Sequence, residues 1–189
     1  GSDEYPEYSD STFVDIAAVF VNGTNYALFN QQQAQPLSIL DQNLAAGNFI
    51  NNDDGQRAIE YDGVSTKLEI VAPVVQGVNT IKFAIGDTGD SAYDSGLFIA
   101  NMAATNLQGF GLAEVVPVVG ATAPVTDKEG NQIYQMSDAF TTLLLTGGDD
   151  IVQGSPTGID YIKFAYSIAE LLGGSLADGV LTLQGPSGS

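Results

Sequence analysis

The residues best suited to chemistry lie together in one acidic loop, residues 85–96. Within eight residues it carries three aspartates, Asp87, Asp90 and Asp94, and no Lys or Arg follows Lys82 for more than forty residues. Two full charges about 4 Å apart repel by roughly 4 kcal/mol at an effective dielectric constant near 20. Such crowding requires solvent or a cation. The loop is therefore a candidate calcium site, although its spacing is not that of an EF-hand.

The chain contains no His and no Cys. Thiolate and imidazole metal ligands are therefore absent, together with every catalytic arrangement that pairs a nucleophile with a His. The remaining ligands favour hard, oxygen-bound ions such as Ca²⁺. A carboxylate pair such as Glu60 and Asp62 could suggest a glycosidase, but nothing in the sequence fixes the separation that this mechanism needs. The sequence predicts a binding protein and not an enzyme.

The net charge of −18 comes from 23 acidic and 5 basic residues. This charge repels nucleic-acid phosphates and anionic membrane surfaces, so we expect no nucleic-acid partner. Bound divalent cations would offset the self-repulsion of the chain. The apolar run at residues 13–21 is interrupted by Asp15 and is shorter than the roughly 20 residues of a membrane span, so we expect no membrane insertion.

The elements that position the acidic loop are expected to be short strands. Runs rich in β-branched and aromatic residues recur every 8 to 15 residues between Gly, Pro and Asn, and Asn22-Gly23 is a hairpin signal. Segments 138–146 and 159–172 fit either a helix or a strand. The pattern predicts an all-β, antiparallel β-sandwich of the jelly-roll or lectin-like kind with calcium-binding loops. Expected strands are residues 14–21, 26–29, 57–61, 66–72, 78–85, 97–100, 113–119, 133–136 and 180–183.

The sequence predicts one main domain. Residues 1–11 are acidic and polar, which is typical of a linker or a loosely held edge, and order should begin near Thr12. Residues 12–184 are then a single β-sandwich ligand-binding domain, which at this length can bury a substantial core. Residues 185–189 are rich in Gly and Ser and should form a linker. The Asn- and Asp-rich residues 44–55 are best explained as an ordinary turn.

The order of motifs around the acidic loop resembles a known family. Asp62-Gly63 is followed by Thr66, a Pro to Gly turn at residues 73–77, an apolar strand and then the Asp-x-x-Asp-x-x-x-Asp-Ser pattern of residues 87–95. This order resembles the choice-of-anchor domains of bacterial surface proteins, over about residues 8–100. More closely, it looks like the peptide-binding domain of giant repeats-in-toxin adhesins.

This resemblance implies a calcium-stabilised β-sandwich at the tip of a secreted bacterial adhesin that acts in cell adhesion and biofilms. Calcium near the acidic loop would help to bind the exposed C-terminal carboxylate of a peptide or protein on a target cell surface. We expect a monomeric module within a longer surface protein. The implied metal ligands are Asp62, Asp87, Asp90 and Asp94, and the implied ligand contacts are Asp90, Ser91, Tyr93 and Asp94.

A second acidic segment lies at residues 147–151. Its Gly-Gly-Asp-Asp-Ile sequence resembles half of a calcium-binding nonapeptide repeat, but it occurs once, and a single copy more often marks a turn. Asp149 and Asp150 are therefore a possible second metal site.

Two other functions remain open. A calcium-dependent lectin would chelate sugar hydroxyls with the same ions, and a structural spacer would use calcium for rigidity alone. Binding to peptides with free or amidated C-termini, with and without a chelator, distinguishes these functions from peptide binding.

Overall fold

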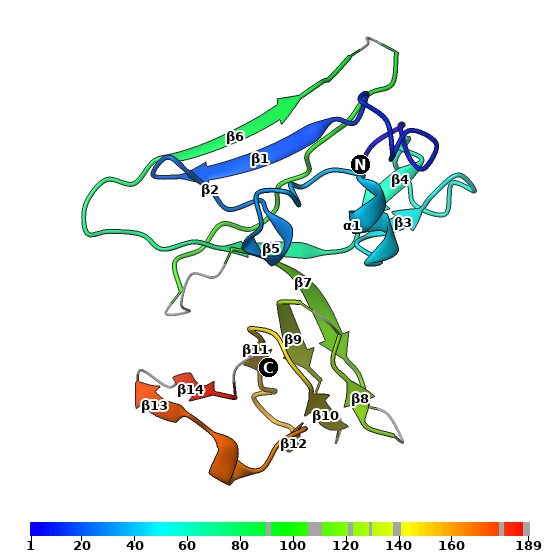
Figure 1. Cartoon of the computed structure of the whole chain (residues 1–189). Coiled ribbons are helices and arrows are strands. Elements are labelled where there is room, and N and C mark those ends of the chain that lie inside the picture. The colour runs from blue at the N-terminus through cyan, green and yellow to red at the C-terminus, as the bar shows by residue number, and fades with distance from the viewer. Residues whose placement is uncertain are drawn as a thin grey trace. The chain divides into compact units, whose positions relative to one another are not determined.

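The computed structural model describes residues 1–89, 92–105, 111–120, 123–128, 130–137, 141–177 and 180–186 (Figure 1). Its contacts divide the chain into two compact units, which are described separately below. The first unit holds residues 1–104 and 108–112, and the second holds residues 105–107 and 113–189. The single domain expected over residues 12–184 stays a prediction.

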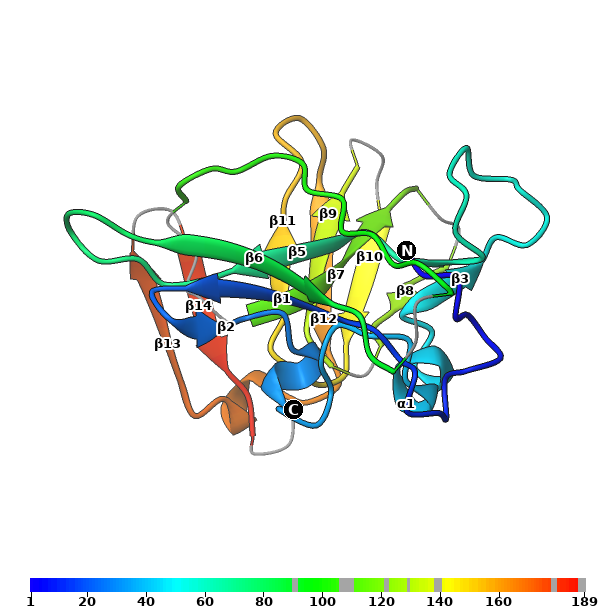
Figure 2. The ribbon, with the colours of Figure 1, turned by 90° about the horizontal axis from the view of Figure 1, so that it is seen from above.

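The first unit contains an antiparallel sheet in the order β2-β1-β6. Strand β1 (Ile16–Val21) turns at Asn22-Gly23 into β2 (Thr24–Asn25), and β6 (Ile81–Gly86) pairs with β1 from Ile16↔Gly86 to Val21↔Ile81. Figure 2 shows β1 and β6 side by side. Asn22 and Gly23 both have positive φ, 51° and 87°, which suits the tight hairpin turn predicted there.

The rest of the first unit consists of short elements. Strands β3 (Phe49–Asn51) and β4 (Gly63–Ser65) form an antiparallel pair, and β5 is Leu68–Val71. The 3-10 helix η1 spans Phe29–Gln31 and α1 spans Asp41–Ala45. The buried apolar side chains of this unit include Val14, Val19, Val21, Ala27, Phe29, Ile39 and Val71.

The strand predicted at residues 57–61 is wrong, because the structure has bends there. The Asn52 side chain, which is almost fully buried, organises this loop. Its Oδ1 accepts a hydrogen bond from the Arg57 N–H at 2.8 Å, and its Nδ2 donates to the carbonyls of Ile59 and Tyr61 at 3.1 and 3.0 Å. These side-chain bonds take the place of strand pairing.

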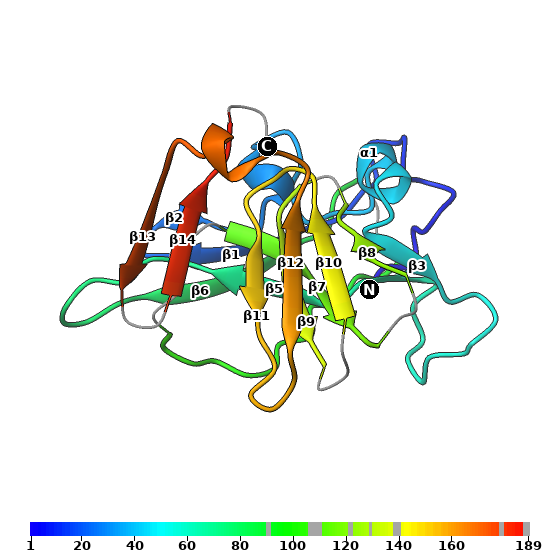
Figure 3. The same ribbon diagram turned by 90° about the horizontal axis from the view of Figure 1, so that it is seen from below.

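The second unit winds consecutive strands alternately into two parallel sheets. One holds residues 113–118 of β7 (Gly111–Val118), β9 (Gln132–Met136) and β11 (Ile151–Gln153). The other has the order β8 (Val125–Thr126), β10 (Thr141–Leu145) and β12 (Asp160–Phe164). Figure 3 views this unit from below.

The register of these sheets shows a regular coil. In the first of these sheets Val115 pairs with Ile133, and Ile133 pairs with Ile151, so that each turn takes 18 residues. In the other sheet Leu143 pairs with Val125 and with Ile162, at spacings of 18 and 19 residues. Leu143 of β10, fully buried, packs with Val118, Tyr134 and Met136 in the core between the sheets. The coil therefore buries apolar side chains between its two parallel sheets.

The C-terminal part of the second unit is an antiparallel hairpin. Helix η2 (Ile168–Glu170) leads into β13 (Gly173–Ala177), which pairs with β14 (Val180–Gln184). Of the two segments left open by the sequence, residues 159–172 form β12 and η2, and the described part of 138–146 forms β10. The all-β prediction is confirmed. Besides antiparallel sheets, the structure contains two parallel sheets, both in the second unit.

Candidate functional site

The first four residues lie between the two halves of the motif found in the sequence. The backbone of Ser2 exchanges hydrogen bonds with Gly63 at 2.9 and 3.0 Å. On the other side, the Asp3 N–H donates to the Asp94 carbonyl at 3.0 Å, and the Gly96 N–H donates to the Gly1 carbonyl at 2.9 Å. Figure 1 shows the N-terminus beside β4. This segment therefore brings Asp62-Gly63 and the end of the acidic loop together.

Two glycines make this close approach possible. A Cβ on Gly63 would overlap the ring of Tyr5, and a Cβ on Gly96 would overlap the ring and hydroxyl of Tyr61. The overlapping atoms are side-chain atoms of two half-buried tyrosines, and the Tyr61 ring also lies against Gly1. A glycine at each position lets the chains approach to hydrogen-bonding distance.

Asp3, which belongs to none of the sequence motifs, adds a carboxylate to this region. Burial raises the pKa of Asp3, and the negative charges of Asp62 and Glu60 raise it further. Hydrogen bonds from the backbone of Asp62 and Asp94 act in the opposite direction. The carboxylates of Asp3, Glu60 and Asp62 therefore influence one another across two segments of the chain.

Glu4 and Asp15 are two further carboxylates, and both are buried, with 1% and 6% of their surface exposed. Glu4 accepts hydrogen bonds from the hydroxyls of Ser2 and Ser95, the second at 3.3 Å. Burial raises the pKa of Glu4, and the charge of Asp15 acts in the same direction. A buried carboxylate of this kind requires compensation, because desolvation penalises its charge.

Asp15 holds the opposite end of the acidic loop. Its Oδ1 accepts a hydrogen bond from the Thr88 N–H at 3.0 Å, and the Thr88 hydroxyl donates to the Val14 carbonyl at 2.7 Å. Residues 1–15 therefore fix the loop at both ends. Residues 1–11, expected to form a linker or a loose edge, are in fact packed, with Ser2, Glu4 and Ser9 all buried.

Aromatic side chains flank the loop. The ring centroids of Tyr93 and Tyr8 lie 5.3 Å apart, and Tyr8 makes an edge contact with Phe13 at 6.4 Å. Tyr93 keeps 43% of its surface exposed. It therefore packs on one side and can contact a ligand on the other. Tyr5 and Tyr8 are the sequence signal that could have marked residues 1–11 as packed, since linkers contain few aromatic residues.

The structure brings the segments of two predicted site residues, Asp62 and Asp94, together at residues 2 and 3. Asp62 is half-buried, while Asp87 and Asp94 are exposed, at the end of β6 and at the end of the loop. Asp90 and Ser91 lie outside the described residues. Among the residues that the structure describes, no group of three or more acidic side chains is close enough to hold a metal ion. A calcium site at the loop stays a prediction.

The second acidic segment lies at a turn of the coil. The Asp150 Oδ1 accepts a hydrogen bond from the Gln132 N–H at 3.0 Å, and the Asp149 N–H donates to the Asn131 side chain at 3.2 Å. Burial raises the pKa of Asp150 to about 7, with further contributions from the charges of Asp127 and Asp149, against the Gln132 hydrogen bond. The turn at residues 147–150 therefore stacks on the preceding turn.

Asp127 lies in the same stack and is fully engaged. One of its oxygens accepts the Tyr134 hydroxyl, and the other accepts the N–H groups of Thr146 and Gly147 at 3.1 and 3.2 Å. These bonds stabilise a carboxylate without a metal ion. Metal binding by Asp149 and Asp150 stays a prediction.

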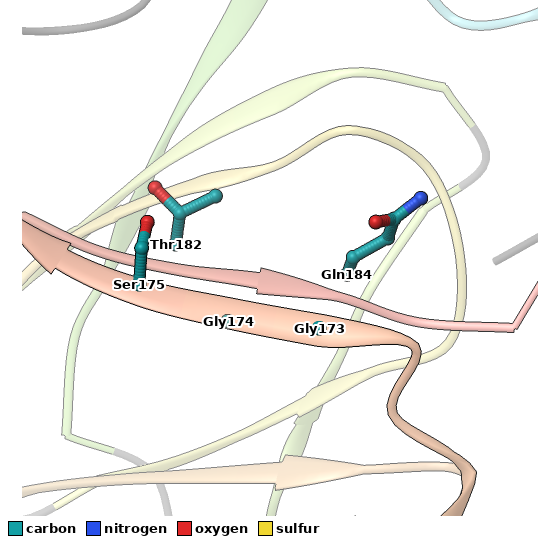
Figure 4. Close-up of a pocket in the computed structure, with 5 residues that line it drawn as sticks. All are labelled: Gly173, Gly174, Ser175, Thr182 and Gln184. Carbon is teal, nitrogen blue, oxygen red and sulfur yellow. The ribbon is translucent and has the colours of Figure 1, made fainter.

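A shallow pocket of about 240 Å³ lies at the C-terminal hairpin. Figure 4 shows the side chains of Ser175, Thr182 and Gln184 pointing to one side of it, beside Gly173 and Gly174. None of these residues is titratable, so the pocket offers no acid, base or strong metal ligand.

Comparison with known proteins gives one family. The model of the choice-of-anchor L domain matches residues 1–105, a range that includes the N-terminal segment and the whole acidic loop. No curated protein and no solved structure matches the chain. Among the described residues, no helix has the length and apolar character needed to cross a bilayer.

Proposed function

Because the chain belongs to the choice-of-anchor L domain family, whose members are surface-associated bacterial domains, we propose that it binds peptide ligands at the bacterial surface with the help of calcium. In this proposal the ligand is the C-terminal segment of a protein on a target cell, and the acidic loop holds its terminal carboxylate. The family is one of surface domains and not of enzymes, and its members are secreted or displayed on the cell surface.

The observation that supports this proposal best is that residues 1–3 hold two acidic segments together through backbone hydrogen bonds: Ser2 pairs with Gly63, which follows Asp62, and the Asp3 N–H donates to the Asp94 carbonyl. The Asp94 carbonyl accepts the Asp3 N–H, the charge of Asp62 acts on the Asp3 carboxylate, and the buried Glu4 follows Asp3 in the chain. In the part of the chain that the structure describes, the single ion pair, between Lys128 and Glu114, belongs to the second unit. Among the described residues of the first unit, no carboxylate forms an ion pair with a Lys or Arg side chain.

The donor set suits calcium. Carboxylate and carbonyl oxygens are the ligands that calcium takes, six to eight at a time. Asp62, Asp87, Asp90 and Asp94 would hold the ion. When bound, calcium would reverse the local negative potential, so that a carboxylate could approach a loop that otherwise repels it. The exposed side of Tyr93 would contact the last side chain of the peptide.

Equilibrium binding to paired peptides tests this function. A panel of peptides with free C-termini should bind in calcium and lose at least tenfold in affinity on amidation or on addition of a chelator. Asp94→Asn should reduce binding, while Asp54→Asn, which removes the same charge from an exposed turn, should not. Binding that survives amidation would contradict the proposal, and sugar binding in its place would favour the lectin. Complete lack of binding would favour the spacer.

A further inference from the structure

Strand β6 forms one edge of the first unit's sheet. It pairs with β1 over all six of its residues, and the sheet order is β2-β1-β6. Among the described residues, no strand pairs with the other edge of β6. Figures 1 and 2 show β6 on the outside of this sheet. An unpaired edge carries a row of free N–H and C=O groups, which can pair with another chain.

The edge also presents an apolar row. Ile81, Phe83 and Ile85 alternate along β6, and their side chains are 44%, 39% and 47% exposed. They share a face with Val21 and Val19 of β1, which are buried. The apolar surface of this face therefore continues past the covered core onto the edge strand. Natural edge strands usually carry Pro, a bulge or several charges that prevent pairing, and β6 has only Lys82.

The direction of β6 connects this edge to the acidic loop. Gly86 is the last residue of the strand, and Asp87 follows it directly. A peptide lying along β6 with its terminal carboxylate at the loop must run in the same direction as β6. It would therefore form a parallel pair with the strand.

We propose that the C-terminal segment of the partner adds to the free edge of β6 as a parallel strand, with alternate apolar side chains packed on Ile81, Phe83 and Ile85. This inference rests on the proposed function, because the position of the carboxylate sets the strand direction. Main-chain hydrogen bonds would supply affinity, and the alternate side chains would supply specificity. The sequence of the partner then matters well beyond its last residue.

Charge further defines the partner. Lys82 lies on the opposite face of β6, with its Nζ 5.7 Å from the centre of the Phe20 ring. The only other basic residues of the first unit are Arg57 and Lys67. Because Lys82 precedes Gly86 by four residues, or about 13 Å of strand, an acidic side chain about four residues before the carboxylate fits best. A basic side chain at that place would be repelled.

A substitution scan tests the strand geometry. Six-residue peptides with a free carboxylate are titrated against the calcium-loaded protein, and each residue is replaced in turn by Ser. We expect a period of two: one alternate set loses at least tenfold in affinity, and the other loses less than threefold. Dependence on the last one or two residues alone would overturn the proposal.

Photo-crosslinking tests the direction. A photoreactive residue next to the carboxylate should label residues 85–89, and one placed five residues earlier should label residues 79–82. The reverse pattern would mean an antiparallel strand and would overturn the proposal, as would labelling with no order.

Variants of β6 separate this inference from the proposed function. Phe83→Ser and, independently, Ile85→Ser should weaken peptide binding at least tenfold while calcium binding is unchanged, and Ile159→Ser, an exposed isoleucine of the second unit, is the control. Calcium-dependent binding of the carboxylate without a period of two would overturn strand addition alone. A period of two without calcium dependence would contradict the calcium site alone. Dimers that form through β6 and exclude the peptide would overturn the proposed partner.

Discussion

The acidic loop of the first unit and the Gly-Gly-Asp-Asp turn of the second contain similar residues in different settings. In the second unit, the oxygens of Asp127 and Asp150 accept hydrogen bonds from backbone N–H groups of neighbouring turns. In the first unit, the side chains of Asp62 and Asp94 accept no hydrogen bond from the described residues. Whether carboxylates already accept hydrogen bonds within the protein is therefore more informative about metal binding than sequence similarity to a calcium motif.

Calcium should therefore act mainly on the first unit. An ion that binds only the folded state stabilises it by about 2.7 kcal/mol at a hundredfold excess over its dissociation constant. We expect a chelator to lower the melting temperature in thermal unfolding followed by circular dichroism. This decrease in melting temperature should disappear in Asp94→Asn and persist in Asp150→Asn. The reverse result would mean that calcium binds at the turn of residues 147–150 and not at the acidic loop.

The close approach at Gly63 gives the next largest effect. Gly63→Ala places a Cβ against the Tyr5 ring, and overpacking of this kind costs about 1–3 kcal/mol. Gly86→Ala is the matched control, because no atom lies within 4 Å of a Cβ added there. Denaturant unfolding of both variants measures the difference. Equal stabilities would mean that residues 1–5 do not pack on Gly63 in solution.

Asp15 should stabilise the loop through Thr88. Asp15→Ala leaves the Thr88 N–H without its partner, and an unsatisfied buried donor costs about 1–3 kcal/mol. Asp10→Ala, an exposed acid in the same segment, should change the free energy of unfolding by less than about 0.5 kcal/mol. If Asp15→Ala were as stable as the control, the hydrogen bond between Thr88 and Asp15 would not stabilise the loop.

The smallest effect concerns the pH dependence of the second unit. Burial raises the pKa of Asp150 to about 7 in the folded protein, well above the ordinary value of 3.8, so the folded state binds this proton more tightly than the unfolded state. Its contribution favours folding below pH 4 and is lost as the pH rises from about 4 through 7. Asp150→Asn should flatten this part of the stability profile. Asp53→Asn, an exposed aspartate, should leave it unchanged, and an unaltered profile in Asp150→Asn would mean that Asp150 titrates normally.

Local patterns in the sequence predicted much of the first unit. The β-branched runs of β1 and β6 and the Asn22-Gly23 turn are short-range signals, and the structure confirms them. The role of residues 1–4 could not be predicted in the same way, because Ser2 pairs with Gly63 and with Ser95, far along the chain. No local pattern encodes such contacts.

The second unit was harder to predict for a different reason. Its strands recur at intervals that also fit hairpins, and the 18-residue spacing of Val115, Ile133 and Ile151 is visible only when the register is known. Gly173 and Gly174 begin β13, although two consecutive glycines are typical of a turn, because β14 supplies the pairing. Tertiary pairing overrides the low strand propensity of Gly in this case.

Calorimetric titration of calcium into the chelator-treated chain tests the central claim most directly. We predict that the chain binds calcium, that Asp94→Asn and Asp62→Asn each lose the tightest site, and that Asp150→Asn keeps it. Absence of calcium binding, or an unchanged tightest site in both Asp94→Asn and Asp62→Asn, would contradict the claim that the acidic loop is a calcium site.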